Sequence, residues 1–246
     1  MTNAKEEPSI KKSSYSVEVM YPSDIEWSTK RSDDVDLITE EDAEGYAVEI
    51  VYDSDPLNSR TEYDAHIGTL IGGGHISDED VPTIPSEREL CNYIAWDLGI
   101  DVPDEYEFAE DKKLREKFED DLWDKVFILP VYKYKHGNVA FSTTPFRSTW
   151  DSGQVGWIYI TKERAEEELE HYKGKYPEGR SLKEHVYHIL RGEVKTYSAW
   201  RSGEVYGFRL HDTEEQEVFD SCYGYYDKKY CESEAFRSLK YWLNNE

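Results

Sequence analysis

The sequence predicts an α+β fold, with a mainly antiparallel sheet built from hairpins and with flanking helices. Short segments alternate apolar and polar residues, as half-buried strands do, and turns rich in Gly, Asn and Asp join several of them. Other segments place apolar residues at helical spacing and begin at a Ser or Thr. Because most strands come in hairpin pairs, we expect neighbouring strands to be antiparallel.

Two strands are predicted early in the chain. Alternation and β-branched residues mark residues 15–20 and residues 46–52. The acidic stretch 23–45 is expected to be a loop with a short helix near residues 39–42, and residues 53–60 a turn region. The glycine run 68–74 lacks the Gly-Lys-Ser/Thr ending of a phosphate-binding loop, so we interpret it as a flexible loop or bulge.

Two helices are predicted next. Ser86, with Glu89 three positions later, forms a capping box for a helix over residues 87–98, which Gly99 ends. A second, strongly charged helix is expected over residues 110–125, with one apolar stripe facing inward.

The second half of the chain carries more strand signal. A strand is predicted over residues 127–134, and Pro130 within it indicates an edge or bulged strand. The turn at residues 136–138 makes a hairpin with residues 139–144. The remaining predicted elements are a strand over 156–161, a helix over 162–172 capped by Thr161, a helix over 182–191 capped by Ser181, a hairpin of strands 204–211 and 217–225, and a helix over 232–243. Whether the helix capped by Ser181 continues in part over residues 192–203 is left open.

These elements predict a disordered tail over residues 1–13 and a single α+β domain over residues 14–246, with residues 78–125 as a candidate acidic helical insertion. No apolar run reaches the roughly 18 residues that a membrane span needs, and the N-terminus lacks the apolar core of a signal peptide. The three cysteines, Cys91, Cys222 and Cys231, are expected to be reduced thiols of a cytosolic protein.

Charge is the strongest feature of the sequence, with a formal net charge of −24 over 246 residues. Residues 1–125 hold 12 Lys and Arg against 34 Asp and Glu, whereas residues 126–246 hold 17 against 19. Nucleic acid is a poor direct partner for the acidic half, because phosphate contacts need cations. A basic protein surface that itself binds DNA or RNA is the natural partner. Solubility alone, or a halophilic source, would also explain the charge.

The candidate partner-binding residues are acidic clusters of this first half. They are Asp33, Asp34, Asp36, Glu40, Glu41, Asp42, Asp78, Glu79, Asp80, Asp104, Glu105, Glu107, Glu119, Asp120 and Asp121.

Aromatic residues near turns and strand ends are expected to supply buried contacts with a partner, although more than half of them should belong to the core. The candidates are Trp150, Trp157, Trp200, Tyr223, Tyr225, Tyr226 and Tyr230.

No catalytic residue, cofactor or metal is predicted. His185 and His188 lie three positions apart on one helix and could hold zinc, but nothing in the sequence marks a third ligand. Asp151-Ser152 with a distant histidine suggests a hydrolase, but the Gly-x-Ser-x-Gly pattern of a nucleophile elbow is absent. We therefore expect Asp151 and Ser152 to hydrogen-bond within their own turn.

Thr143-Thr-Pro-Phe146 followed by Trp150-Asp-Ser-Gly-Gln-Val-Gly156 resembles a family of acidic proteins encoded by bacterial phages and prophages. Shorter matching pieces extend the resemblance over roughly residues 46–226, and the helices expected at residues 86–125 depart from the family pattern. The family has no characterised activity, so no catalytic residue is carried over. Within the run, Trp150, Asp151, Ser152, Gly153, Gln154 and Gly156 are interpreted as a structural motif.

The resemblance implies a phage protein made in the cytoplasm of a host bacterium. The leading hypothesis is a non-enzymatic inhibitor of a host defence or DNA-handling complex, of the anti-CRISPR or anti-restriction type, whose acidic surface imitates nucleic acid. Two alternatives stay open: a small hydrolase-like or nucleotide-modifying enzyme that uses Asp151, Ser152 and a histidine, and a phage assembly or scaffold protein that forms a homo-oligomer.

Overall fold

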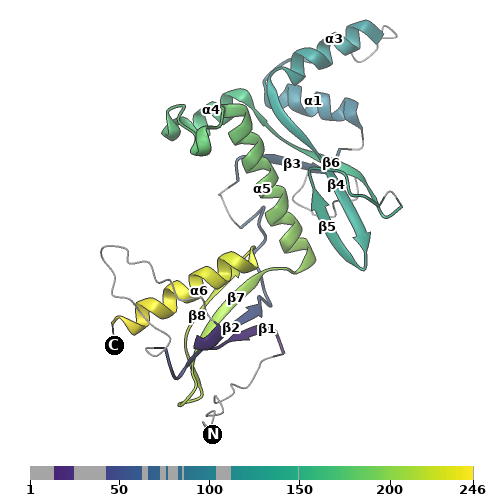
Figure 1. Cartoon of the computed structure of the whole chain (residues 1–246). Coiled ribbons are helices and arrows are strands. Elements are labelled where there is room, and N and C mark those ends of the chain that lie inside the picture. The colour runs from purple at the N-terminus through teal and green to yellow at the C-terminus, as the bar shows by residue number, and fades with distance from the viewer. Residues whose placement is uncertain are drawn as a thin grey trace. The chain divides into compact units, whose positions relative to one another are not determined.

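The computed structural model describes residues 14–24, 43–62, 66–72, 76, 83–84, 86–103, 112–148 and 150–245. These residues form five α-helices and two four-stranded antiparallel sheets, which confirms the predicted α+β class (Figure 1). None of the described helices is both long enough and apolar enough to cross a membrane. The short helix expected near residues 39–42 lies outside the described residues.

The chain divides into two compact units. Met1–Leu57 and Gly203–Glu246 form the terminal unit, and Asn58–Ser202 form the central unit. The single domain expected over residues 14–246 stays a prediction, because compactness measures packing and not independent folding.

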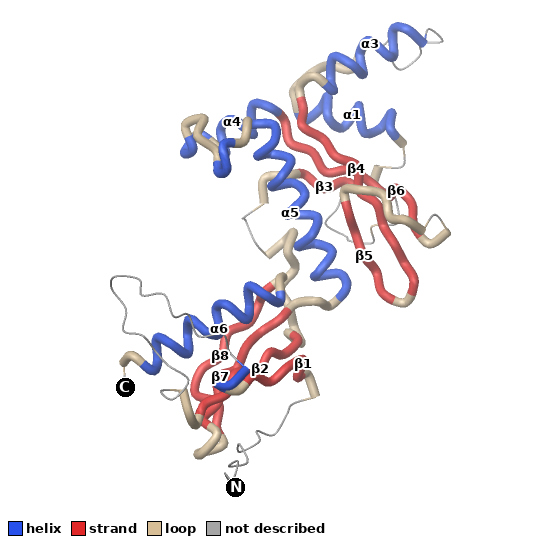
Figure 2. Tube along the Cα trace, viewed as in Figure 1, coloured by secondary structure: helices blue, strands red, loops and turns tan. Residues whose placement is uncertain are grey.

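The terminal unit is an antiparallel sheet of order β1-β2-β7-β8 with one long helix. The strands are β1 (Ser16–Met20), β2 (Tyr46–Tyr52), β7 (Tyr206–Asp212) and β8 (Glu217–Tyr225), and the helix is α6 (Lys228–Leu243). Figure 2 shows α6 lying along this sheet. Alternate residues of β2 and β7, such as Ile50 and Leu210, are buried against Ala235 and Leu239 of α6. The alternation that predicted these strands therefore reflects one face covered by a helix.

The central unit is an antiparallel sheet of order β3-β6-β4-β5, with helices on both of its faces. Its strands are β3 (Thr69–Gly72), β4 (Val126–His136), β5 (Asn138–Ser142) and β6 (Ser152–Thr161). Its helices are α1 (Glu87–Asp97), α3 (Lys112–Trp123), α4 (Lys162–Glu168) and α5 (Leu182–Ser202). Single turns of 3₁₀ helix lie at Glu170–Tyr172 and Pro177–Gly179, and a third, at Pro22–Asp24, lies in the terminal unit.

Successive residues of β4 point to opposite faces of this sheet. Phe127 and Val131 pack with α4 and α5, whereas Val126 and Ile128 pack with α1 and α3. Each face therefore has its own apolar core, and the two cores are separated by the sheet.

The predicted helix caps are confirmed. The Ser86 side chain accepts a hydrogen bond from the backbone N–H of Glu89, and Thr161 accepts one from Arg164 at 3.2 Å. Ser181 accepts one from the N–H of Glu184 at 3.3 Å. The helix that Ser181 caps continues to Ser202, through the segment for which partial helical continuation was left open, because apolar residues on one stripe stay buried along its full length.

The interpretation of the glycine run as a loop or bulge is wrong over residues 69–72. This segment is β3, which pairs with β6 from Thr69↔Tyr159 to Gly72↔Gly156. Leu70 and Ile71 are buried on opposite faces and give the strand its stability. The glycine run predicted a loop because glycines usually weaken strands, whereas Gly72 permits close packing within this one. A β-carbon at Gly72 would lie 2.7 Å from the Ile76 side chain.

The predicted strand around Pro130 is bulged, between Val131 and Tyr132, but it is not an edge strand. β4 lies between β6 and β5, and β5 pairs only with Tyr132–His136. Pro130 therefore has a single neighbouring strand among those described, and the missing N–H is tolerated there.

Candidate partner-binding surface

A cleft of about 340 Å³ opens on the α1 and α3 side of the central sheet. We call it the aromatic cleft. Its lining residues are Glu87, Trp123, Ile128, Pro130, Tyr132, Gln154 and Trp157. The volume is at the lower end of the roughly 300–1,000 Å³ that small-molecule sites span, so the cleft is suited to one side chain or a similarly small group.

Strand register builds the floor of the aromatic cleft. Pro130 of β4 lies opposite Trp157 of β6, and Tyr132 lies opposite Gln154. Opposed residues of antiparallel strands share a face, so these two pairs form a continuous patch. The bulge after Val131 falls between the two pairs, and bulges redirect neighbouring side chains.

Two helices supply the walls. Glu87 is in the first turn of α1, where a carboxylate is favoured by the helix dipole, and Trp123 is the last residue of α3. Behind the cleft, the buried Tyr159 donates its hydroxyl hydrogen bond to Asp97 of α1 at 2.8 Å. Burial, and then this contact with Asp97, raise the pKa of Tyr159 far above its usual value. The phenol therefore stays neutral and ties α1 to the sheet.

Charge in the central unit is uneven. Residues 87–125, which include both wall helices, hold 14 Asp and Glu against 6 Lys and Arg, whereas residues 126–202 hold 9 against 12. Lys133 belongs to the opposite face of the sheet, with its ammonium group 5.7 Å from the centre of the Phe141 ring. Burial, followed by the charges of Arg201 and Lys135, lowers the pKa of Lys133. Of the residues that the structure describes, 87–103 and 112–125 hold 9 Asp and Glu against 6 Lys and Arg, so these segments are net acidic, whereas residues 126–202 are net basic.

The predicted partner-binding residues fall partly inside this region. Glu119, Asp120 and Asp121 are on α3, within the turn before Trp123 of the aromatic cleft, and Asp120 and Asp121 are exposed. The other twelve lie outside the described residues: Asp33, Asp34, Asp36, Glu40, Glu41, Asp42, Asp78, Glu79, Asp80, Asp104, Glu105 and Glu107.

The predicted structural motif leads into β6, and its residues from Ser152 onward form the first half of that strand. Trp150 is 96% exposed, and Gln154 lines the aromatic cleft. A β-carbon at Gly156 would lie 2.0 Å from the carbonyl oxygen of Ile71, so only glycine fits at this position of β6 beside β3. At Gly153, by contrast, a β-carbon would meet no atom within 4 Å.

Ser152 makes the contact expected within its own turn, whereas the Asp151 carboxylate lies beside His136 at the end of β4. Ser152 donates its hydroxyl hydrogen bond to the carbonyl oxygen of Ser148, within the same turn. The carboxylate of Asp151 lies 3.4 Å from Nδ1 of His136, and the His136 side chain is 74% exposed. The Ser152 hydroxyl therefore points its proton at the backbone and not at a histidine base.

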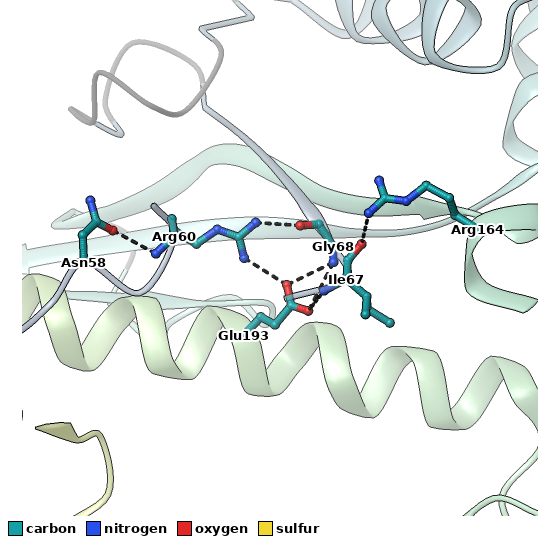
Figure 3. Close-up of polar contacts among 6 residues, drawn as sticks. All are labelled: Asn58, Arg60, Ile67, Gly68, Arg164 and Glu193. Atoms are coloured by element: carbon teal, nitrogen blue, oxygen red, sulfur yellow. Dashed lines mark hydrogen bonds and ion pairs between the residues drawn. The ribbon is translucent and has the colours of Figure 1, made fainter. Parts of the chain in front are cut away.

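A buried ion pair fixes the segment that leads into β3 (Figure 3). Glu193 of α5 accepts hydrogen bonds from Arg60 at 2.9 Å, from the backbone N–H of Ile67 at 2.7 Å, and from that of Gly68. Arg60 also donates to the carbonyl oxygen of Gly68, and Arg164 donates to that of Ile67. This network holds β3 in the sheet, and so it supports the close approach of β3 to Gly156 of β6.

Histidines do not form a metal centre in the described part of the chain, where no group of three or more His, Cys, Asp or Glu side chains is placed to hold an ion. His185 is buried between the rings of Tyr172 and Tyr176, and neither ring nitrogen has a hydrogen-bond partner. Burial, and then the charge of Arg180, lower its pKa. His185 is therefore a neutral core residue.

The terminal unit contains a second polar cluster, on the sheet face away from α6. Glu49 is buried and lies 3.1 Å from Nε2 of His211 and 3.7 Å from Arg209, which itself donates to the Tyr223 hydroxyl at 2.8 Å. Of the aromatic residues predicted to contact a partner, Tyr223 and Tyr230 of this unit are exposed.

Sequence reasoning named only Trp157 of the aromatic cleft as a contact residue and Gln154 as a structural one. Glu87, Trp123 and Tyr132 were missed as site residues, because only strand register and helix packing bring them together. A period-two pattern of Ile128, Pro130, Tyr132 was the one signal available.

No protein-family model matches the chain, and no curated protein and no solved structure matches it. The resemblance to acidic phage proteins therefore stays a prediction.

Proposed function

We propose that this chain is a non-enzymatic, phage-encoded inhibitor that binds a basic, nucleic-acid-handling protein of the host. The acidic surface occupies the site that nucleic acid would use on that protein. The observation that carries the proposal is that the described lining of the aromatic cleft holds the Glu87 carboxylate and no Lys, Arg or His, and that the exposed acids Asp120 and Asp121 lie within the helical turn before Trp123 of the cleft.

Charge and aromatic contact have different roles in such an interface. Exposed carboxylates such as Asp120 and Asp121 accelerate encounter with a basic partner and select against acidic ones. Buried aromatic contacts supply most of the binding free energy, since interface hot spots are rich in Trp and Tyr. The aromatic cleft and the end of α3 bring both kinds of residue together.

A pull-down from bacterial lysate tests the proposal. The wild-type chain should retain a basic protein at about 0.1 M salt and release it at about 0.5 M, where exposed charges are screened. A variant carrying Asp120→Asn, Asp121→Asn and Asp124→Asn removes three exposed charges of α3 and its end and should retain less. The matched control is Glu163→Gln with Glu166→Gln and Glu167→Gln on α4, which should retain the wild-type amount. Recovery of no basic protein at low salt would contradict the proposal.

A further inference from the structure

The chemistry of the aromatic cleft selects a cationic, donor-rich ligand. None of its seven described lining residues is Lys, Arg or His. Glu87 supplies the one carboxylate among these lining residues and Gln154 the one side-chain amide, beside the Tyr132 hydroxyl and the indole N–H groups of the two tryptophans. Trp123, Trp157 and Tyr132 provide aromatic surface, and cations bind the faces of such rings, Trp most strongly. An anionic ligand such as a nucleotide would meet Glu87 with no cation to offset it.

Hydrogen-bond acceptors are available in this cleft. No hydrogen bond or ion pair engages the Glu87 carboxylate within the part of the chain that the structure describes. The side-chain amide of Gln154 donates from Nε2 to the carbonyl oxygen of Gly156 at 3.5 Å. The side-chain oxygen of Gln154 takes no part in that contact and can accept a hydrogen bond from a ligand. A ligand that brings several N–H donors can therefore bond to both residues.

We propose that the aromatic cleft receives a single arginine side chain of the basic partner. A guanidinium group is planar, stacks on aromatic rings and carries five N–H donors, and it loses its hydration more readily than an ammonium group does. Its aliphatic stem packs on Ile128 and Pro130, while the head group reaches Glu87 and Gln154. This inference rests on the proposed function and names the side chain that anchors the partner.

Binding of short peptides to the intact chain tests the inference. The probe is a capped nine-residue Gly/Ser peptide with one central arginine, and matched peptides carry lysine or citrulline instead. NMR follows the indole N–H signals of Trp123 and Trp157. The arginine peptide should shift both signals with a dissociation constant on the order of 1 mM, which a lone cation–π contact with an ion pair can reach. Citrulline, which lacks the charge, should bind at least about tenfold more weakly, and lysine about threefold more weakly.

Two substitutions in exposed residues locate the binding site without disturbing the core. Glu87→Gln and Gln154→Ala should each weaken arginine-peptide binding by about threefold to tenfold. Glu163→Gln is the matched control, since Glu163 is likewise an exposed acid in the first turn of a helix, α4, and does not line the cleft. Its affinity should equal that of the wild type.

The outcomes separate this inference from the proposed function. If the basic partner is retained in a salt-sensitive way but the arginine peptide shifts neither indole, the arginine site is wrong and the proposed function stands. If the arginine peptide binds as described but no basic protein is retained, the site stands and the proposed inhibitor role is wrong. Shifts produced by AMP or by a neutral oligosaccharide, with none from the arginine peptide, would overturn the assignment of the ligand.

Discussion

Glu193 offers the sharpest test of how the central unit is held together. Replacing it with alanine removes the carboxylate that accepts from Arg60, Ile67 and Gly68. Arg60 and Glu193 side chains are each only 9% exposed, so the guanidinium would be left buried without its counter-ion. Breaking such a pair from one side costs about 3–5 kcal/mol. Two backbone N–H groups also lose an acceptor, at about 1–3 kcal/mol each where water cannot replace it.

Glu193→Ala is therefore expected to lose at least about 3 kcal/mol of unfolding free energy, a large share of the roughly 5–15 kcal/mol of a typical protein. Urea unfolding followed by circular dichroism measures it, and the midpoint should fall by more than about 1 M. Glu193→Gln keeps an acceptor oxygen and should lose less. The control is Glu178→Gln, which breaks the ion pair with Arg180 at a side chain that is 74% exposed, and it should change stability by under about 1 kcal/mol. A loss for Glu193→Ala no larger than that of the control would show that the buried ion pair does not stabilise the central unit.

Gly156→Ala should cost at least about 3 kcal/mol in urea unfolding, because the new β-carbon meets a β3 carbonyl at 2.0 Å, whereas Gly153→Ala, with open space, should cost under about 1 kcal/mol. Burial lowers the pKa of His185, so below about pH 6.5 the unfolded chain binds a proton that the folded chain does not. The free energy of unfolding should therefore fall as the pH drops below about 6.5. His185→Phe should reduce this dependence of the unfolding free energy on pH. A thiol reagent at pH 8 should modify Cys222, which is exposed, and spare Cys231, whose pKa burial raises to about 12; equal rates for both thiols would contradict this.

Local signals in the sequence predicted most strands and the starts of α1, α4 and α5, whereas α6 begins at Lys228, four residues before its predicted start. Ser86, Thr161 and Ser181 work as caps because the bond from a side-chain oxygen to an N–H three positions later depends only on nearby residues. The same holds for the hairpin turn at Gly137, whose φ of +80° suits glycine.

Features that depend on packing between distant segments were not predictable in this way. β3 was missed because Gly72 packs closely against Ile76, and because β3 pairs with β6, which lies more than 80 residues later. The aromatic cleft was missed because the pairing of Pro130 with Trp157 depends on strand register, and the position of Trp123 depends on how α3 packs. The charge asymmetry, in contrast, is visible from composition alone.

We propose that this acidic chain takes the place of nucleic acid on a basic partner. The most direct measurement is displacement of fluorescently labelled double-stranded DNA from the captured partner at about 0.1 M salt, followed by fluorescence anisotropy. The wild-type chain should release the DNA with an equimolar end point, and the Asp120→Asn, Asp121→Asn, Asp124→Asn variant should need a higher concentration. A complex in which the partner holds DNA and this chain together, with unchanged anisotropy, would contradict it.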